Sequence, residues 1–309
     1  MAEGIHRADV GGGIELAYER FGDPSDPPLL LLMGLATQML GWPDEFCGQL
    51  ARRGLSVVRF DNRDVGLSTH LGHARPPDVP AALSGDTSST SYTLSDMARD
   101  AVGLLDALDV ESAHVVGASM GGMIAQTLAI ERPERIRTLT SIMSTTGDPS
   151  VGGASEEAFG VLLAPPARDR AEAIERTVAT YRVIGSPAYE LDEPALRERA
   201  GLSFDRGYDP AGVARQLVAI LASGDRTERL RRLRLPTLVI HGTEDPLVRV
   251  SGGRATATAI PGAELFELDG MGHDLPRALW PEIVDRIVSL VERVERERAA
   301  TRRRAQSRT

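Results

Sequence analysis

Three side chains far apart in the sequence, Ser119, Asp245 and His273, have the chemistry of a nucleophile, an acid and a base. A serine hydroxyl is a weak nucleophile at neutral pH and needs a base within hydrogen-bond reach. A histidine can be that base, and a carboxylate can hold it in the right tautomer. These residues therefore predict attack on a carbonyl carbon through an acyl-enzyme, a reaction that requires neither a metal ion nor an organic cofactor.

The serine lies in Gly-Ala-Ser-Met-Gly, residues 117–121, which has the pattern G-x-S-x-G. The short β-branched run at 114–116 predicts a strand, and apolar residues at helical spacing from Met123 onward predict a helix. On such a turn the serine hydroxyl projects above the sheet, and the amide of Met120 is free to face an oxyanion. The alternative is a glycine-rich helix start in another α/β domain, with Ser119 as the N-cap.

Asp245 and His273 each come just after a predicted strand. Asp245 follows the apolar run 235–240 in a turn that contains Pro246, and His273 lies in a glycine-lined loop after a last short strand. The side chains can meet because the carboxyl ends of parallel strands share one edge of a sheet. Glu244 and Asp148 are alternative acids, the latter because it lies just past the preceding strand.

A second oxyanion donor is expected after the continuous apolar run 29–33, which is typical of a strand buried on both faces. The chain leaves the carboxyl end of this strand at Gly34, so the amide of Leu35 is the candidate donor. Gly34 and Trp42 are candidate substrate contacts, although packing in the core is the favoured role of Trp42.

The remaining patterns alternate between strands and helices, as in an α/β fold with a mostly parallel sheet flanked by helices. Residues 14–19 predict an edge strand, and a capping box at 93–96 begins an amphipathic helix. The segment 70–91 is rich in Pro, Gly, Ser and Thr and predicts a long loop. A terminal helix is expected from about 277 to 297, followed by a frayed basic tail.

From residue 147 the alternation stops for about eighty residues, and only helical patterns occur, at 156–163, 170–184, 194–204 and 210–222. A helical insertion after the sixth strand, at the ligand edge of the sheet, predicts a cap or lid. We therefore expect a core of residues 1–146 and 228–309, interrupted by a cap of residues 147–227. The alternative is a helical decoration away from any site.

Composition excludes several classes of function. The net charge of −9 argues against a nucleic-acid surface, and all 35 basic residues are arginine, which excludes lysine-based cofactor anchoring. A single cysteine, Cys47, excludes an internal disulfide. No signal peptide or long apolar run is evident, so a cytoplasmic protein without membrane contact is expected. A homodimer is compatible with the sequence, although no helix shows a dimerisation stripe.

With GASMGG at the serine, HGTEDPLV at the acid and MGH at the histidine, the chain resembles the α/β-hydrolase-fold serine hydrolases over essentially its full length. The stretches LLLMGLATQMLGWPDEFC and RFDNRDVGLST are similar to those of esterases of the aclacinomycin methylesterase type. The resemblance implies a triad of Ser119, Asp245 and His273 and an oxyanion hole formed by the Leu35 and Met120 amides. One departure is Met33, which stands where the family usually has histidine before Gly34.

These observations favour a serine hydrolase that cleaves the carboxylic ester of a medium-sized, largely apolar small molecule. By the resemblance, this could be a methylesterase of polyketide-type metabolism. A lactonase, thioesterase, perhydrolase or C–C bond hydrolase would use the same triad, and the sequence leaves these alternatives open. A non-catalytic binding protein of the same fold is a further alternative, which the presence of all three triad residues disfavours.

Overall fold

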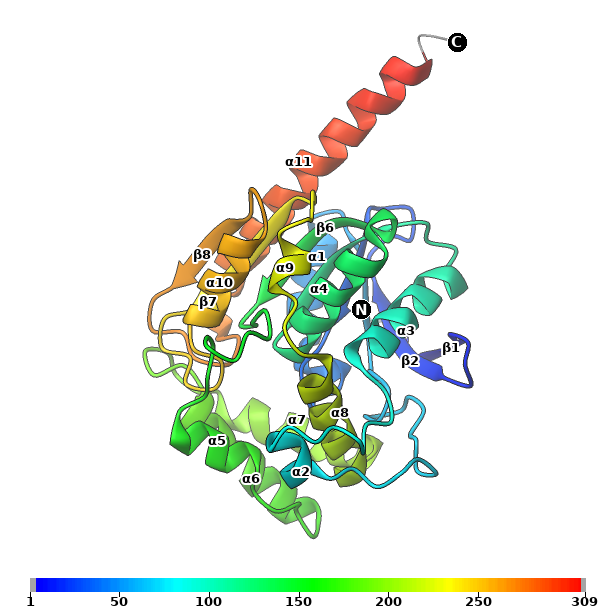
Figure 1. Cartoon of the computed structure of the whole chain (residues 1–309). Helices are drawn as coiled ribbons and strands as arrows, with labels where there is room; N and C mark the ends of the chain where they lie inside the picture. Colours follow the sequence, from blue (N-terminus) through cyan, green and yellow to red (C-terminus); the bar gives the residue numbers. More distant parts are fainter. Residues whose placement is uncertain (1–3, 307–309) are drawn as a thin grey trace.

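A computed structural model describes residues 4–306 of the chain. One sheet of eight strands runs through these residues in the order β1-β2-β4-β3-β5-β6-β7-β8 (Figure 1). β2 is antiparallel to its neighbours β1 and β4, and all other pairs are parallel, which confirms the predicted mostly parallel sheet. The strands are β1 (His6–Asp9), β2 (Glu15–Phe21), β3 (Pro28–Leu32), β4 (Ser56–Phe60), β5 (Ala113–Ala118), β6 (Ile136–Ile142), β7 (Thr237–Gly242) and β8 (Glu264–Leu268).

Helices cover both faces of the sheet, and the alternation along β3 shows why this strand is apolar throughout. Leu30 and Leu32 pack into the cluster that contains α3 and α4, whereas Leu29 and Leu31 pack into the cluster that contains α1 and α11. The helices outside the insertion are α1 (Asp44–Arg52), α2 (Val79–Leu83), α3 (Leu94–Ala107), α4 (Met120–Glu131), α10 (Ser251–Ala259) and α11 (Trp280–Gln306). Short 3-10 turns lie at Met39–Gly41, Pro133–Arg135 and Arg277–Leu279.

Five helices lie between β6 and β7 in the sequence, three of them of 14 or 15 residues. Figure 1 shows α5 to α8 gathered beyond one end of the sheet, whereas the short α9 lies beside α4 and α10. Their Asp and Ser N-caps explain where several of them begin, since the side chains of Ser155, Asp169, Asp192 and Asp209 accept from the first turns of α5 to α8. Each of the four predicted helical ranges is confirmed as a helix, and its ends differ from the prediction by two residues or fewer. The insertion consists of α5 (Glu156–Leu162), α6 (Arg170–Ile184), α7 (Glu193–Arg206), α8 (Pro210–Ser223) and α9 (Thr227–Leu230).

Three expectations are corrected. The strand predicted at 14–19 is not at the edge of the sheet, because β2 pairs with β1 on one side and with β4 on the other. The segment 70–91 is not a plain loop, because α2 begins after the N-cap Asp78, whose side chain accepts from the amide of Ala81. The terminal helix does not end near residue 297, since α11 continues to Gln306 and its last turns leave the body of the molecule (Figure 1). Alanine and arginine, which dominate residues 298–305, are good helix formers. Among the residues that the structure describes, no helix is both long and apolar enough to span a bilayer.

Candidate active site

The turn between β5 and α4 places Ser119 in an unusual backbone conformation, with φ 56° and ψ −121°. A positive φ strains a residue with a side chain, so the surroundings must hold it. The Ser119 amide donates to the carbonyl of Ile142 at 2.9 Å. The flanking glycines are required by space, because a Cβ at Gly117 would lie 2.1 Å from the carbonyl oxygen of Gly121. This is the geometry that the G-x-S-x-G pattern predicts.

The structure brings the three predicted side chains into one hydrogen-bonded chain. Ser119 Oγ lies 3.0 Å from His273 Nε2, and His273 Nδ1 lies 2.7 Å from Asp245 Oδ2. Both His273 and Asp245 are buried. The amide of His273 also donates to the carbonyl of Ile184 at 2.6 Å, so the end of α6 helps to fix the histidine loop. The arrangement can pass the serine proton to a histidine that a carboxylate orients.

The environment of Asp245 keeps this carboxylate ionised. Its Oδ1 accepts from the amides of Leu247 at 2.9 Å and Val248 at 2.8 Å. Burial by itself would raise the pKa of Asp245, but the neighbouring His273, the nearby His241 and the hydrogen bonds from His273 and the Val248 amide outweigh it and lower the pKa to about 2. An acid in this position stabilises a positive charge that develops on the imidazole.

His241 is a neighbour of the acid whose role the sequence analysis missed. Its Nε2 donates to the carbonyl of Val248 at 2.6 Å and lies 3.6 Å from Asp245 Oδ2. Because a carbonyl only accepts, Nε2 carries the proton, and Nδ1 has no hydrogen-bond partner among the described residues. A Cβ at Gly253 would lie 2.3 Å from Nδ1, so a glycine is needed beside the ring. The four-residue spacing from His241 to Asp245 was the available signal.

The two alternative acids do not reach the histidine. Asp148 Oδ1 accepts from the amide of Ser150 at 2.8 Å and from its hydroxyl at 2.7 Å, in an exposed turn after β6. Glu244 is exposed and faces a cavity beside the triad. Asp245 is therefore the carboxylate that the structure places on His273.

The backbone after β3 lies against the nucleophile. A Cβ at Gly34 would be 3.1 Å from Ser119 Cβ and 3.5 Å from Ser119 Oγ. The next amide, that of Leu35, donates to no other residue that the structure describes. Met120 is the first residue of α4, so its amide is one of the unpaired donors at a helix N-terminus. One expected oxyanion donor thus follows Ser119 directly in the chain, and the other follows Gly34, whose backbone lies against Ser119.

Trp42 lies in the core. The side chain is fully buried and stacks on Phe46 with 5.6 Å between ring centroids. This burial agrees with the packing role that was favoured for Trp42 over a substrate contact.

A cavity of about 370 Å³ is lined in part by Glu244, Pro246 and Asp274, which are the sequence neighbours of the acid and the histidine. It lies between the connection from α6 to α7 and the loops that hold Asp245 and His273. Ser186 Oγ donates to Asp274, and burial raises the pKa of this carboxyl. The lining residues are Tyr181, Arg182, Val183, Gly185, Ser186, Pro187, Tyr189, Leu191, Glu244, Pro246 and Asp274.

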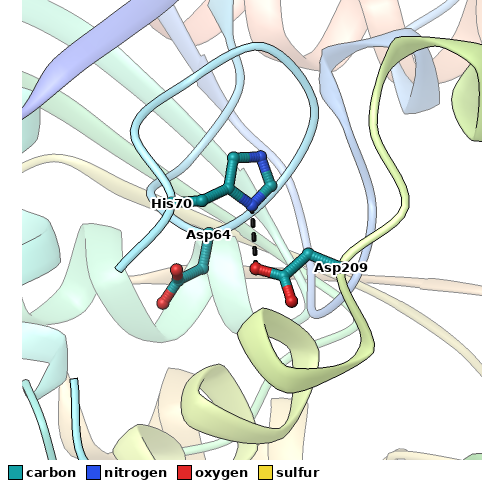
Figure 2. Close-up of side chains that lie close together, drawn as sticks. All are labelled: Asp64, His70 and Asp209. Atoms are coloured by element: carbon teal, nitrogen blue, oxygen red, sulfur yellow. Dashed lines mark hydrogen bonds and ion pairs between the residues drawn. The ribbon is translucent and has the colours of Figure 1, made fainter. Parts of the chain in front are cut away.

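One cluster outside the triad has metal-ligating residue types: Asp64, His70 and Asp209 (Figure 2). Figure 2 shows His70 directed at Asp209, with Nδ1 2.9 Å from Oδ2. The guanidinium of Arg215, however, binds both oxygens of Asp64 at 2.8 Å and also reaches Asp209 Oδ2 at 3.1 Å. An arginine already supplies the positive charge that these carboxylates need, so the cluster is an ion-pair network rather than a cation site.

Comparisons with known proteins identify the family of the chain. Residues 27–276 match the family described as alpha/beta hydrolase fold. Rhodomycin D methylesterase DauP of Streptomyces sp. (strain C5) is 33% identical over 86% of this chain and 91% of its own, and DnrP of Streptomyces peucetius, of the same name, is 32% identical over the same shares. The crystal structure of a hydrolase from Pseudomonas aeruginosa PA01 covers 95% of this chain and 99% of its own, with 26% identity and a TM-score of 0.70. The chain therefore belongs to the α/β-hydrolase fold family, as an enzyme of the carboxylic-ester hydrolase type.

Proposed function

We propose that the chain hydrolyses a carboxylic ester through an acyl-enzyme on Ser119. The observation that carries the proposal is the chain of hydrogen bonds from Ser119 Oγ through His273 to Asp245, built on a strained strand-to-helix turn. A serine without a nearby base would have no means of losing its proton at neutral pH.

In the first half of the reaction, Ser119 Oγ forms a bond to the ester carbonyl carbon while its proton passes to His273 Nε2. The carbonyl oxygen becomes an oxyanion that the amides of Leu35 and Met120 stabilise. The tetrahedral intermediate then expels the alcohol, which takes the proton from His273. Asp245 orients the imidazole and stabilises its positive charge throughout.

In the second half, His273 removes a proton from water as the water oxygen adds to the acyl carbon. The same two amides stabilise the second oxyanion. The intermediate collapses, the acid leaves, and Ser119 recovers its proton from His273. Every proton that leaves one oxygen returns to another, so no further reactant is required.

The substrate that we propose is a medium-sized, largely apolar small molecule. Residues 147–227 form a cap over the carboxyl edge of the sheet in this proposal, and the apolar residues of its helices are mainly Leu, Ile, Val and Ala, with few aromatics. The names of DauP and DnrP describe methylesterases, which favours a methyl ester of a polyketide-type compound. Lactones, thioesters, perhydrolysis and C–C bond hydrolysis remain the alternative reactions on the same triad.

Labelling with a fluorophosphonate tests the proposal, because this probe reacts only with an activated serine. We expect intact-protein mass spectrometry to show one adduct on the wild type and none on Ser119→Ala. A chain-length series of p-nitrophenyl esters then measures the acyl group that the site accepts. If the wild type forms no adduct and cleaves none of the esters, the non-catalytic binding protein becomes the better description.

A further inference from the structure

The turn that follows β3 is held in a strained conformation next to the nucleophile. Gly34 accepts from the amide of Thr37 at 3.2 Å, which closes a four-residue turn, and Ala36 within it has φ 61°. A positive φ at the third position is the mark of a type II turn and favours glycine. With alanine there, something outside the turn must offset the strain.

Gln216 on α8 supplies a contact that does this. The amide of Ala36 donates to Gln216 Oε1 at 3.0 Å, and the carbonyl of the same peptide unit, from Leu35, accepts from the Thr37 hydroxyl at 3.1 Å. At its other end, Gln216 Nε2 donates to the carbonyl of Arg63 at 2.8 Å. The side chain is fully buried, so both ends of its amide are used inside the protein.

The helix that presents Gln216 is itself fastened to the core by its neighbouring residue. Arg215 makes a bidentate ion pair with Asp64, and the two side chains are 3% and 0% exposed. At the start of α8, the N-cap Asp209 bonds to His70, as Figure 2 shows. These contacts fix the position from which Gln216 reaches the turn.

A second inserted helix holds the same loop further along. Gln38 donates to the carbonyl of Ser203 at 2.7 Å and of Gly207 at 3.1 Å, and its oxygen accepts from Arg206 at 2.9 Å. The loop after β3 is thus bonded to α7 and α8, which are distant from it in sequence.

We propose that Gln216 is a positioning residue for the oxyanion hole. Through Ala36 it fixes the turn that presents the Leu35 amide, so the hole is complete only while α8 is seated on the core. The inference rests on the proposed function, because it assigns a support to the Leu35 donor of that reaction. An inserted helix would then position part of the catalytic machinery as well as help to enclose the substrate.

The test compares two buried glutamines. Gln216→Met removes both hydrogen bonds at similar volume. Gln126→Met is the matched control, because Gln126 is also fully buried and bonded at both amide ends, to Ser141 at 3.3 Å and Arg226 at 3.2 Å, but it does not touch the turn after β3. The measurements are kcat and KM for a p-nitrophenyl ester and the inhibition constant of a trifluoromethyl ketone. This ketone accepts Ser119 Oγ at its carbonyl carbon and so places an oxyanion in the hole, while the serine proton passes to His273.

We expect Gln216→Met to lower kcat by about 10- to 100-fold with little change in KM. A misplaced donor stabilises the oxyanion less well than a correctly placed one, and the loss should be a part of the loss caused by deleting the donor. The inhibition constant of the ketone should rise by the same factor, whereas that of the corresponding secondary alcohol, which forms no oxyanion, should not change. Gln126→Met should leave all of these values near those of the wild type.

If the wild type cleaves the ester but Gln216→Met binds the ketone as tightly as the wild type does, this inference is overturned and the proposed function stands. A wild type that neither turns over the ester nor binds the ketone overturns both. If Gln216→Met does not fold, as judged by thermal unfolding, Gln216→Asn is compared with Gln126→Asn instead, because the shorter side chain cannot span the same two partners. The same outcomes then decide.

Discussion

Replacing Asp245 by asparagine keeps the shape of the acid but changes its pattern of donors. In the wild type, Oδ1 accepts from the amides of Leu247 and Val248, and Oδ2 lies 2.7 Å from His273 Nδ1. The asparagine oxygen must stay on the two backbone donors, so its NH₂ group turns toward Nδ1. Nδ1 then has to accept, and the imidazole proton moves to Nε2, beside Ser119 Oγ.

A histidine that carries its proton on Nε2 cannot accept the proton of the serine. We therefore expect kcat/KM of Asp245→Asn to fall by about 10⁴, equivalent to about 5 kcal/mol in the activation free energy. The rate of fluorophosphonate labelling should fall in parallel, because it depends on the same proton transfer. Both rates are measured on protein whose thermal unfolding shows that it is folded.

The two other carboxylates provide the controls. Asp148→Asn and Glu244→Gln should stay within about threefold of the wild type, since neither side chain contacts His273. An Asp245→Asn variant with near wild-type activity, together with a large loss in either control, would refute the assignment. Because the pKa of Asp245 is about 2, its protonation should affect the wild-type kcat/KM only at very acidic pH.

Three further substitutions test other parts of the structure. Gly34→Ala places a Cβ 3.1 Å from the Cβ of the nucleophile and should lower kcat about tenfold. Gly153→Ala, whose Cβ meets nothing within 4 Å, should leave kcat unchanged. Equal kcat values for the two variants would contradict the close approach of Gly34 to Ser119. His241→Leu leaves a buried carbonyl without its donor and should lower the free energy of unfolding by about 1–3 kcal/mol and kcat/KM severalfold, as chemical denaturation and kinetics would show. For His70, burial opposes protonation, but the hydrogen bonds to the Gly66 carbonyl and to Asp209 outweigh it and raise the pKa. A raised pKa stabilises the fold at pH values below the unfolded-state pKa, and this stabilisation is lost as the pH rises through the folded-state pKa. The decrease in the free energy of unfolding caused by His70→Gln should therefore be larger near about pH 5 than near about pH 9.

The parts of the site that the sequence predicted are those set by local patterns. The turn around Ser119 follows from five consecutive residues, and the acid and the histidine each follow a recognisable strand. Helical periodicity located α5 to α8 for the same reason. A strand or helix is specified mainly by its own residues once its buried face is known, so these features could be read in order along the chain.

The parts that the sequence did not predict depend on side chains that meet across long separations. The contact of Gln216 with Ala36 spans 180 residues, and that of Arg215 with Asp64 spans 151. No local pattern in the sequence states which arginine Asp64 binds. The unexpected length of α11 has a different cause. Its last turns leave the body of the molecule, so helix propensity acts there without a packing signal.

The direction of α11 has a practical consequence for handling the protein. Figure 1 shows the end of this helix pointing away from the molecule at the side opposite α5 to α8. A linker joined after Gln306 would therefore begin at the side of the molecule opposite α5 to α8. Protein immobilised through its C-terminus would present these helices to the solution, which makes this end the better place for an affinity tag, a fluorophore or a solid support.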